Sequence, residues 1–165
     1  MNARDILKYG QQTVLQTLES FPEASWETPG ACGVWSVKDI IAHLASYERV
    51  LVDILTTFTG GSAPVLNSYV ELGSQFNDIE VSRRTAKTIQ DVLAEFNDTH
   101  LQVMSLLVTI APETRSLSGT LPWYGMEYAL DDVLVYMYYG HKREHSAQIA
   151  AFRDHLREAG VTGGN

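Results

Sequence analysis

The sequence predicts an all-α protein, a four-helix bundle with a long crossover between its second and third helices. Two observations support this prediction. Four long stretches repeat their apolar residues with the 3.6-residue period of a helix, and no stretch alternates apolar and polar residues as a paired strand does. Long amphipathic helices bury their apolar faces by packing together as a bundle. The length of 165 residues fits one ordinary domain, so residues 1–165 are predicted to form a single domain.

The first two predicted helices cover about residues 3–21 and 37–58. The first has an apolar face made of Leu7, Val14, Leu18 and Phe21. The second begins with a clear signal, because Ser36 can cap its first turn and Asp39, three residues later, can complete a capping box. Its apolar face consists of Ile40, Ile41, Leu44, Leu51 and Leu55. The glycines at 60 and 61 are predicted to end it.

The third and fourth predicted helices cover about residues 88–110 and 131–159. The apolar stripe of the third consists of Ile89, Leu93, Phe96, Val103 and Leu107. Gly160 is the predicted C-terminal cap of the fourth helix. The inward stripe of the fourth consists of Leu134, Met137, His141, His145, Gln148, Phe152 and Leu156. Two histidines of the last helix are therefore predicted to face the core.

Two long connections remain between the helices. Residues 61–87 are long for a structureless connection, and a short helix is predicted within them at about residues 70–76. They form the predicted crossover between the second and third helices. Residues 113–130 are predicted to be a second loop, which carries a Leu-Pro-Trp-Tyr-Gly sequence.

Composition excludes several classes of function. The net charge is −8 and the twelve Lys and Arg are scattered, whereas a nucleic-acid binder shows a basic stripe that neutralises phosphates. No apolar run reaches the ~18 residues of a membrane span, and the N-terminus lacks the apolar core of a signal peptide. The single Cys32 rules out an internal disulfide and fits a reducing cytosol. We therefore expect a cytoplasmic protein without nucleic-acid or membrane partners.

Three histidines are the strongest functional signal. His141 and His145 are four residues apart, so on a helix their imidazoles lie on one face and can share one metal ion. The same spacing also fits two partly buried histidines that are simply hydrogen-bonded. His43 leans inward from the second helix. Three inward histidines from two packed helices with an open fourth position are typical of a catalytic zinc site.

The sequence also resembles a known family. The run W-S-V-K-D-I-I-A-H-L at 35–44, followed some 97 positions later by H-x-x-x-H at 141–145, is similar to the DinB-like superfamily of bacterial four-helix bundles. That superfamily includes the YfiT-type metal-dependent hydrolases. The F-N-D sequence at 76–78 and Arg84 resemble its members as well. The similarity covers nearly the whole chain in layout and is specific at about a dozen positions.

This resemblance implies a divalent metal, nickel or zinc, held by His43, His141 and His145. It implies either hydrolysis or the transfer of a low-molecular-weight thiol, such as bacillithiol or mycothiol, to an electrophile. The substrate would be a small molecule. Dimerisation is common among relatives, which makes a homodimer an expectation here, and the family is linked to stress response. The alternative is a non-catalytic module that binds a small molecule or partner and uses the metal to hold two helices together.

Five further residues are candidates for the site. Glu144 has the position of a general base near the metal, although a solvated charge is the simpler interpretation. Asp39 can orient the imidazole of His43 if its capping role leaves it free. Gln148 and Tyr47 are placed to support the ligands or contact a substrate, or simply to pack. Trp123 is either a wall of the substrate pocket or part of a satellite core.

Other polar residues are assigned simpler roles. His100 lies on the inner stripe of the third helix, so it is either a rival ligand or a buried histidine bonded to a carbonyl. His155 is predicted to lie on the surface, and Lys142 and Arg143 are predicted to point outward. Cys32 precedes the second helix and is either a reactive thiol near the positive end of that helix or a packed side chain.

Overall fold

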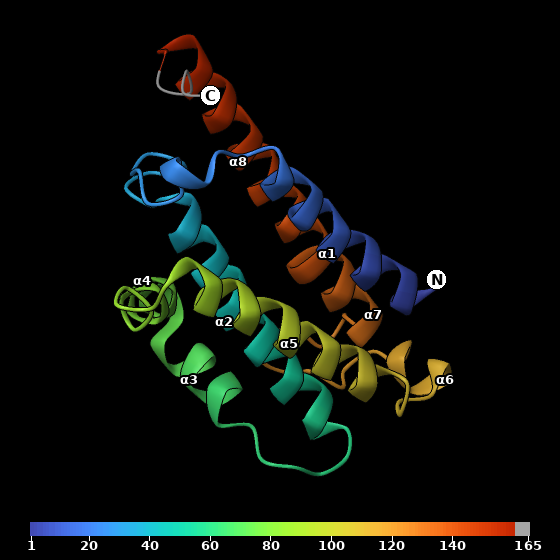
Figure 1. Ribbon diagram of the computed structural model, residues 1–165. Coiled ribbons are helices and arrows are strands. Elements are labelled where there is room, and N and C mark those ends of the chain that lie inside the picture. The colour runs from blue at the N-terminus through green and yellow to red at the C-terminus, as the bar shows by residue number, and fades with distance from the viewer. Residues whose placement is uncertain (161–165) are drawn as a thin grey trace.

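The structure is a computed structural model that describes residues 1–160 (Figure 1). Residues 161–165 of the predicted single domain lie outside the described residues. Helices are the main secondary structure of the described residues, which contain no β-strand, and this confirms the all-α class. None of the described helices is both long and apolar enough to cross a membrane. The four longest helices are α1 (Ala3–Glu19), α2 (Val37–Thr57), α5 (Ile89–Leu107) and α8 (His141–Glu158).

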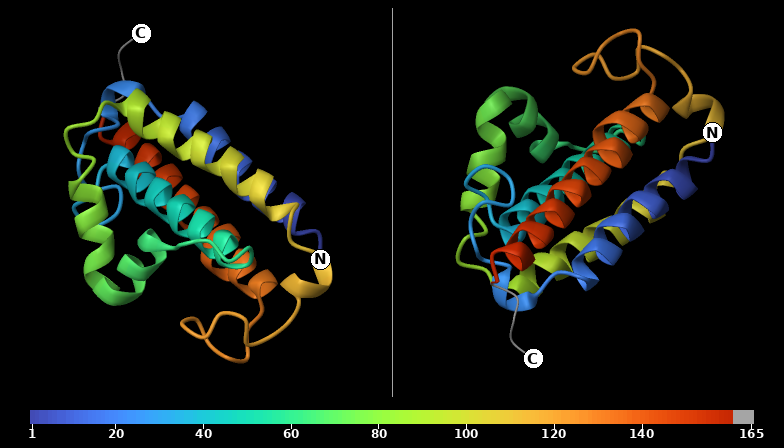
Figure 2. Two further views of the ribbon diagram at one scale, coloured as in Figure 1. Left: turned by 90° about the horizontal axis from the view of Figure 1, so that it is seen from below. Right: turned by 90° about the horizontal axis from the view of Figure 1, so that it is seen from above.

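The four longest helices lie alongside one another (Figure 2) and form two closely packed pairs. Helix α2 packs against α5, α1 packs against α8, and contacts of α2 with α8 and of α1 with α5 join the pairs. The apolar faces predicted for the helices are mostly turned inward. The predicted stripe residues that are buried include Leu7, Val14, Ile40, Ile41, Leu44, Leu51, Leu55, Phe96, Val103, Leu107, Leu134 and Leu156. The hydrophobic effect of these stripes therefore sets which face of each helix is inside.

Helix α2 begins and ends where its sequence signals predict. The Ser36 Oγ accepts a hydrogen bond from the Asp39 backbone N–H at 3.1 Å, and the Asp39 Oδ2 accepts one from the Ser36 N–H at 2.9 Å. This reciprocal pair is the predicted capping box. Gly60 follows the helix with φ +78°, a conformation that favours glycine. Gly160 has φ +74° just after α8, in agreement with its predicted capping role.

The connection between α2 and α5 is more helical than the sequence predicts. It contains α3 (Pro64–Leu72), a 3₁₀ turn η2 (Gly73–Gln75) and α4 (Phe76–Ser82). The predicted single helix at 70–76 is wrong, because Gly73 interrupts it with φ +54°. The Asp53 Oδ2 accepts hydrogen bonds from the backbone N–H groups of the first turn of α3, at 2.6 and 3.0 Å. A carboxylate of α2 thus caps α3 and keeps the connection close to α2.

Short helices also occur in the other connections. The 3₁₀ turn η1 (Glu23–Ser25) lies between α1 and α2, and α6 (Pro112–Arg115) begins the second predicted loop. The predicted fourth helix comprises three successive parts in the structure. They are α7 (Leu130–Val133), the π-helical segment η3 (Leu134–Gly140) and α8.

The π-helical segment ends immediately before His141. Gly140 has no side chain, and a Cβ at this position would lie 3.3 Å from the Val135 carbonyl oxygen, closer than most such contacts. Wider π-helical turns occur frequently at functional sites, where they shift the register of the residues that follow. The segment therefore sets the angular position at which the first histidine of α8 points into the core.

The predicted outward orientation of Lys142 is wrong. Its side chain is 2% exposed, and its Nζ lies 2.6 Å from the Glu48 Oε1 in α2. Nζ also donates a hydrogen bond to the Gln11 Oε1 of α1 at 3.0 Å. Position 142 lies where α8 packs against both helices, so the lysine charge is buried and paired instead of solvated. Arg143 is exposed, as predicted.

Candidate metal centre

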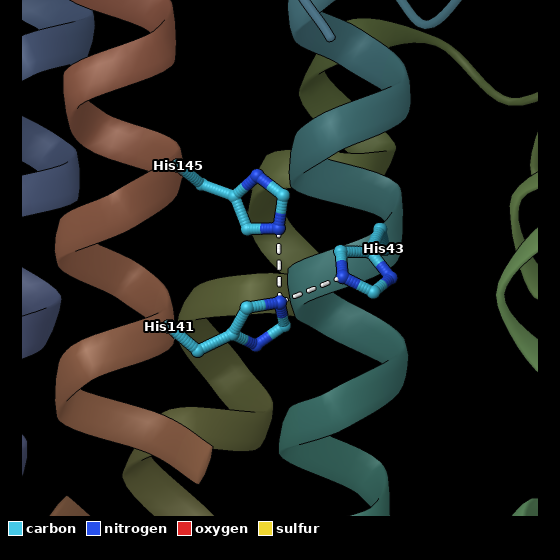
Figure 3. A group of neighbouring side chains, drawn as sticks. All are labelled: His43, His141 and His145. Carbon is cyan, nitrogen blue, oxygen red and sulfur yellow. Dashed lines mark hydrogen bonds between the residues drawn. The ribbon is translucent and has the colours of Figure 1, made fainter. Parts of the chain in front are cut away.

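His43, His141 and His145 meet at one point between α2 and α8 (Figure 3). The Nε2 atom of His141 lies 2.9 Å from the Nε2 of His43 and 2.9 Å from the Nε2 of His145. All three ligand atoms are within 4.8 Å of one another. One helical turn on α8 supplies two of them, and the packing of α8 against α2 supplies the third. The structure thus brings together the three histidines selected from the sequence.

Burial keeps these imidazoles neutral at physiological pH. His43 is 2% exposed, and burial, followed by the nearby His141 and His145, lowers its pKa to about 2. Burial, followed by His145 and Lys142, lowers the pKa of His141 to about 3. Burial also lowers the pKa of His145. Because metal binding requires the deprotonated imidazole, the site is held in its ligating form.

In both histidines of α8, the Nδ1 atom faces away from the cluster, and its hydrogen bond indicates which ring nitrogen carries the proton. His141 hydrogen-bonds the Met137 backbone carbonyl, and because its Nε2 faces the cluster, its Nδ1 makes this bond. The Nδ1 of His145 lies 2.8 Å from the Gln148 Oε1. An oxygen acceptor at Nδ1 fixes the proton there in a neutral imidazole, so both Nε2 atoms carry lone pairs. Two lone pairs then face each other at 2.9 Å, a contact that a cation between them would turn from repulsive to attractive.

The donor set fits a divalent ion. Metal–nitrogen bonds of ~2.0–2.1 Å in a tetrahedral site place neighbouring nitrogens about 3.3 Å apart. In two of the three pairs the nitrogens are 2.9 Å apart, and in the third they lie within 4.8 Å, so the spacing of the rings brackets the value for a bound ion. Imidazole nitrogen is a ligand suited to zinc and nickel. His141 also borders a cavity of about 270 Å³, lined by Tyr47, Tyr69, Tyr136, Met137, Gly140, His141 and Glu144. A further ligand can therefore approach the cluster.

Tyr47 connects the histidines to a second cavity. Its ring centroid lies 4.6 Å from that of His43 and 4.7 Å from that of His141. Its hydroxyl donates a hydrogen bond to the Asn77 Oδ1 at 3.1 Å. The second cavity, of about 400 Å³, lies beyond this tyrosine and is lined by Tyr47, Tyr69, Val70, Gly73, Ser74, Asn77, Trp123 and Tyr124. Because both cavities share Tyr47 and Tyr69, they form neighbouring parts of one aromatic-walled region.

Of the other predicted site residues, two line the cavities and one does not reach the histidines. Glu144 is exposed and lines the cavity beside His141. Trp123 lines the second cavity, and its ring centroid is 6.0 Å from that of Tyr69. Asp39 does not reach His43, because its carboxylate is occupied by the capping box, and within residues 1–160 the His43 Nδ1 has no hydrogen-bond partner.

The other histidines and the cysteine lie outside the cluster. His100 is buried, and its Nδ1 lies 3.1 Å from the Glu48 Oε2, so its partner is a carboxylate and not the predicted carbonyl. His155 is exposed, as predicted. Cys32 is half-buried and packs against the apolar cluster near the start of α2.

Sequence reasoning missed two contributors to the site. Tyr69 lies in α3, a helix that the sequence did not predict with these bounds, so nothing placed its ring against Tyr47 in the lining of the cavity beside His141. The Met137 carbonyl is a backbone group whose availability follows from the π-helical segment. Neither has a side-chain motif in the sequence. A helical pattern search that started at Pro64 could have found the first, because proline favours the first turn of a helix.

Comparison with known protein families agrees with this geometry. A sequence profile described as the DinB superfamily matches residues 6–149, a span that includes all three clustered histidines. The chain belongs to the DinB superfamily. Searches among curated proteins and among solved structures gave no significant match. Membership of the DinB superfamily and the histidine geometry are therefore the two findings on which a functional proposal rests.

Proposed function

We propose that this DinB-superfamily protein is a metal-dependent enzyme that acts on a small molecule. In this proposal His43, His141 and His145 hold a nickel or zinc ion. The observation that supports it most directly is the convergence of the three Nε2 atoms, with the Nε2 of His141 2.9 Å from each of the other two. Polar nitrogens taken out of water need a partner, and a cation at the centre would serve all three imidazoles at once. The four longest helices act as a four-helix bundle, with α3 and α4 as the crossover, and this scaffold positions the ligands.

In this proposal the ion and the groups around it have different roles in the reaction. An ion held by three neutral imidazoles keeps its full charge and would lower the pKa of a water or thiol bound to it. The Met137 carbonyl and Gln148 hold the two imidazoles of α8 in the ligating tautomer. Glu144, at the cavity beside His141, accepts the proton that the nucleophile releases. Either hydrolysis or transfer of a low-molecular-weight thiol uses these same residues.

The aromatic region supplies the place for the substrate. The cavity beside His141 is adjacent to the cavity of about 400 Å³ walled by Trp123 and Tyr124. A volume of this size holds a small organic molecule. Aromatic walls with one polar group, Asn77, favour a substrate with an apolar or planar portion. The reacting group of such a substrate would then reach His141 past Tyr47.

A second candidate function is a non-catalytic binding module with a structural metal. The burial of His43 and His145 supports this alternative, because an ion between them would join α2 to α8. Closed structural sites have four protein ligands, whereas three histidines converge here next to a cavity. The open side of the cluster therefore favours the enzyme.

Metal analysis tests whether the site binds an ion at all. Protein purified without a histidine tag is analysed for bound metal by mass spectrometry, together with a His141→Ala/His145→Ala variant. We expect about one equivalent of metal in the wild type and almost none in the double variant. His155→Ala removes an exposed histidine from the same helix and is the matched control. Equal, substoichiometric metal in all three proteins would refute the metal site.

Turnover measurements separate the enzyme from the structural alternative. Zinc- and nickel-loaded proteins are screened with small thiols plus electrophiles and with ester and amide substrates. Where turnover is found, Glu144→Gln is expected to lower kcat by about 10²–10⁴-fold, because the general base is lost. Glu158→Gln changes an exposed glutamate at the end of α8 and serves as the control. A large fall in melting temperature on metal removal, without turnover of any substrate, would favour the structural alternative.

A further inference from the structure

A third cavity, lined by charged residues, lies away from the histidines, where α2, α3, α4 and α5 meet. Its volume is about 410 Å³. On α2 it is bordered by Arg49. At 100° per residue, Arg49 is rotated by about 200° around the helix axis from Tyr47, which contacts the histidine cluster. Four of the twelve Lys and Arg of this acidic chain line it. Its lining residues are Arg49, Pro64, Val65, Ser68, Glu80, Arg83, Arg84, Lys87 and Glu95.

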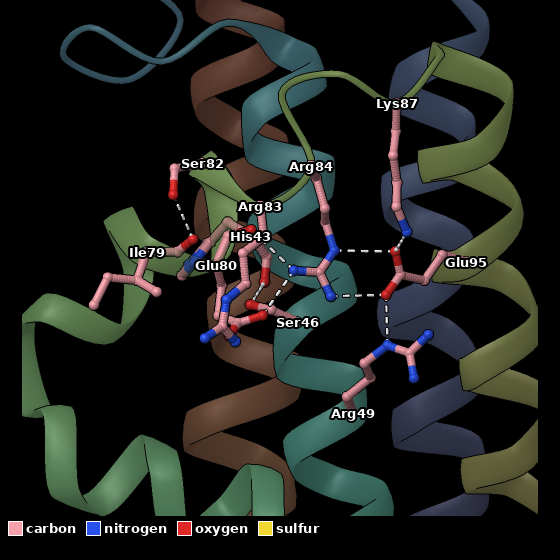
Figure 4. A network of polar contacts seen from close by, with 10 residues as sticks. All are labelled: His43, Ser46, Arg49, Ile79, Glu80, Ser82, Arg83, Arg84, Lys87 and Glu95. Carbon is pink, nitrogen blue, oxygen red and sulfur yellow. Dashed lines mark hydrogen bonds and ion pairs between the residues drawn. The ribbon is translucent and has the colours of Figure 1, made fainter.

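The inner wall of this cavity is a buried ion-pair network (Figure 4). The Arg84 side chain is 6% exposed and donates to both carboxylate oxygens of Glu95, from Nε at 3.0 Å and from Nη2 at 2.7 Å. Its Nη1 donates to the Glu80 Oε2 at 2.8 Å. Burial alone would raise the pKa of Glu95, but Arg84 and Arg49 outweigh it and lower the pKa to about 2. The buried arginine therefore contacts both carboxylates, and its single charge balances one of them.

Three exposed cations form the rim. The side chains of Arg49, Arg83 and Lys87 are 50%, 63% and 47% exposed. Four cations against two carboxylates leave the lining with a net charge of +2. Within the described residues, Arg49 pairs with Glu95 through Nε, and Arg83 pairs with Glu80 through Nη1. A guanidinium has five N–H donors, so both arginines keep donors for a ligand.

We propose that this cavity binds the phosphate group of a small phosphorylated molecule. A phosphate monoester carries close to two negative charges at neutral pH, which matches the net charge of the lining. Planar guanidinium groups suit the bidentate recognition of phosphate oxygens. The Ser68 hydroxyl on α3 supplies an uncharged donor at the same cavity. The volume exceeds that of phosphate alone and leaves space for an organic portion. The residues involved are separate from the histidine cluster, so binding here is independent of the metal.

Calorimetric titration of the zinc-loaded, full-length protein at low ionic strength tests the site. The probes are inorganic phosphate and glucose 6-phosphate, which distinguish a site for phosphate alone from one that also holds the organic portion. We expect a Kd of about 1 mM or below. Arg83→Gln and Lys87→Gln each remove one exposed cation and should weaken binding about tenfold. Arg157→Gln removes an arginine of similar exposure on α8 and should leave the affinity unchanged.

Two further measurements make the result decisive. Amide chemical shifts recorded during the titration should change most at Val65 and Ser68, beside the cavity. Thermal unfolding of each variant shows that it is folded. Absence of binding by both probes, or equal affinity in the wild type and an Arg49→Gln/Arg83→Gln variant, would overturn the proposal. Equal affinity in the wild type and the double variant is also the outcome expected if phosphate binds at the histidine cluster instead.

Discussion

Replacing Lys142 with methionine is expected to destabilise the protein strongly. The change removes the only lysine that pairs with Glu48 among the described residues, and the Glu48 side chain is 0% exposed. The Nζ–Oε1 distance is 2.6 Å, and Lys142 itself is 2% exposed. Removing one partner of a buried ion pair leaves an uncompensated charge and costs about 3–5 kcal/mol of unfolding free energy. For a chain of this size that corresponds to a decrease in melting temperature of roughly 6–20 °C.

Urea denaturation of four proteins measures this effect: the wild type, Lys142→Met, Glu48→Gln and the double variant. The double variant should recover much of the loss, because no unpaired charge remains and the amide introduced by Glu48→Gln can still hydrogen-bond His100. Arg143→Met changes the exposed neighbour and should cost less than about 0.5 kcal/mol. The reasoning is refuted if Lys142→Met costs no more than Arg143→Met, or if the double variant is as unstable as the sum of the single variants.

The same pair has a consequence for the histidine cluster. Glu48 lies five residues after His43 on α2, and Lys142 follows His141 directly on α8. Their ion pair therefore holds the two helices together next to the point where the imidazoles meet. We expect Lys142→Met to weaken metal binding as well, whereas Arg143→Met should not.

Three other predictions follow from the geometry. In metal-free protein the pKa values of His43 and His141 are about 2 and 3 when folded, against 6.5 when unfolded, so the unfolded chain binds more protons between these values. The contribution of these two histidines to the unfolding free energy should be complete above pH 6.5. Below pH 6.5 it should decrease by up to about 1.4 kcal/mol per pH unit for each histidine. Urea titrations that give equal unfolding free energies at pH 7 and pH 5 would contradict this. Ser36→Ala breaks the capping box of α2 and should cost about 1 kcal/mol in the same assay; a cost near zero would show that the cap is unimportant. Trp123→Ala should raise KM more than it lowers kcat, because the ring lines the cavity and not the histidine cluster. A fall in kcat at constant KM in steady-state kinetics would argue against that placement.

Local interactions made much of the fold predictable from the sequence. Helix periodicity and capping depend on residues within about four positions of one another, so Ser36, Asp39 and Gly160 mark helix ends without knowledge of the fold. The spacing of His141 and His145 is local in the same sense, since one helical turn puts them on one face. The inward lean of His43 followed from the apolar face of α2. The three clustered histidines could therefore be selected from the sequence, with the DinB resemblance indicating that they belong together.

The tertiary structure decided what depends on contacts between distant segments. Lys142 is buried because α1 and α2 bring Gln11 and Glu48 to it, and no pattern within α8 shows this. Asp39 had two predicted roles, and the cap uses its carboxylate, so it does not orient His43. The charged cavity requires Arg84 to meet Glu95 from another helix. By itself the sequence determined the four long helical stretches, several of their ends and the inward histidines, because these follow from short-range periodicity. Only the packing of the helices decided which charges are buried together and where cavities open, because side chains far apart in sequence determine both.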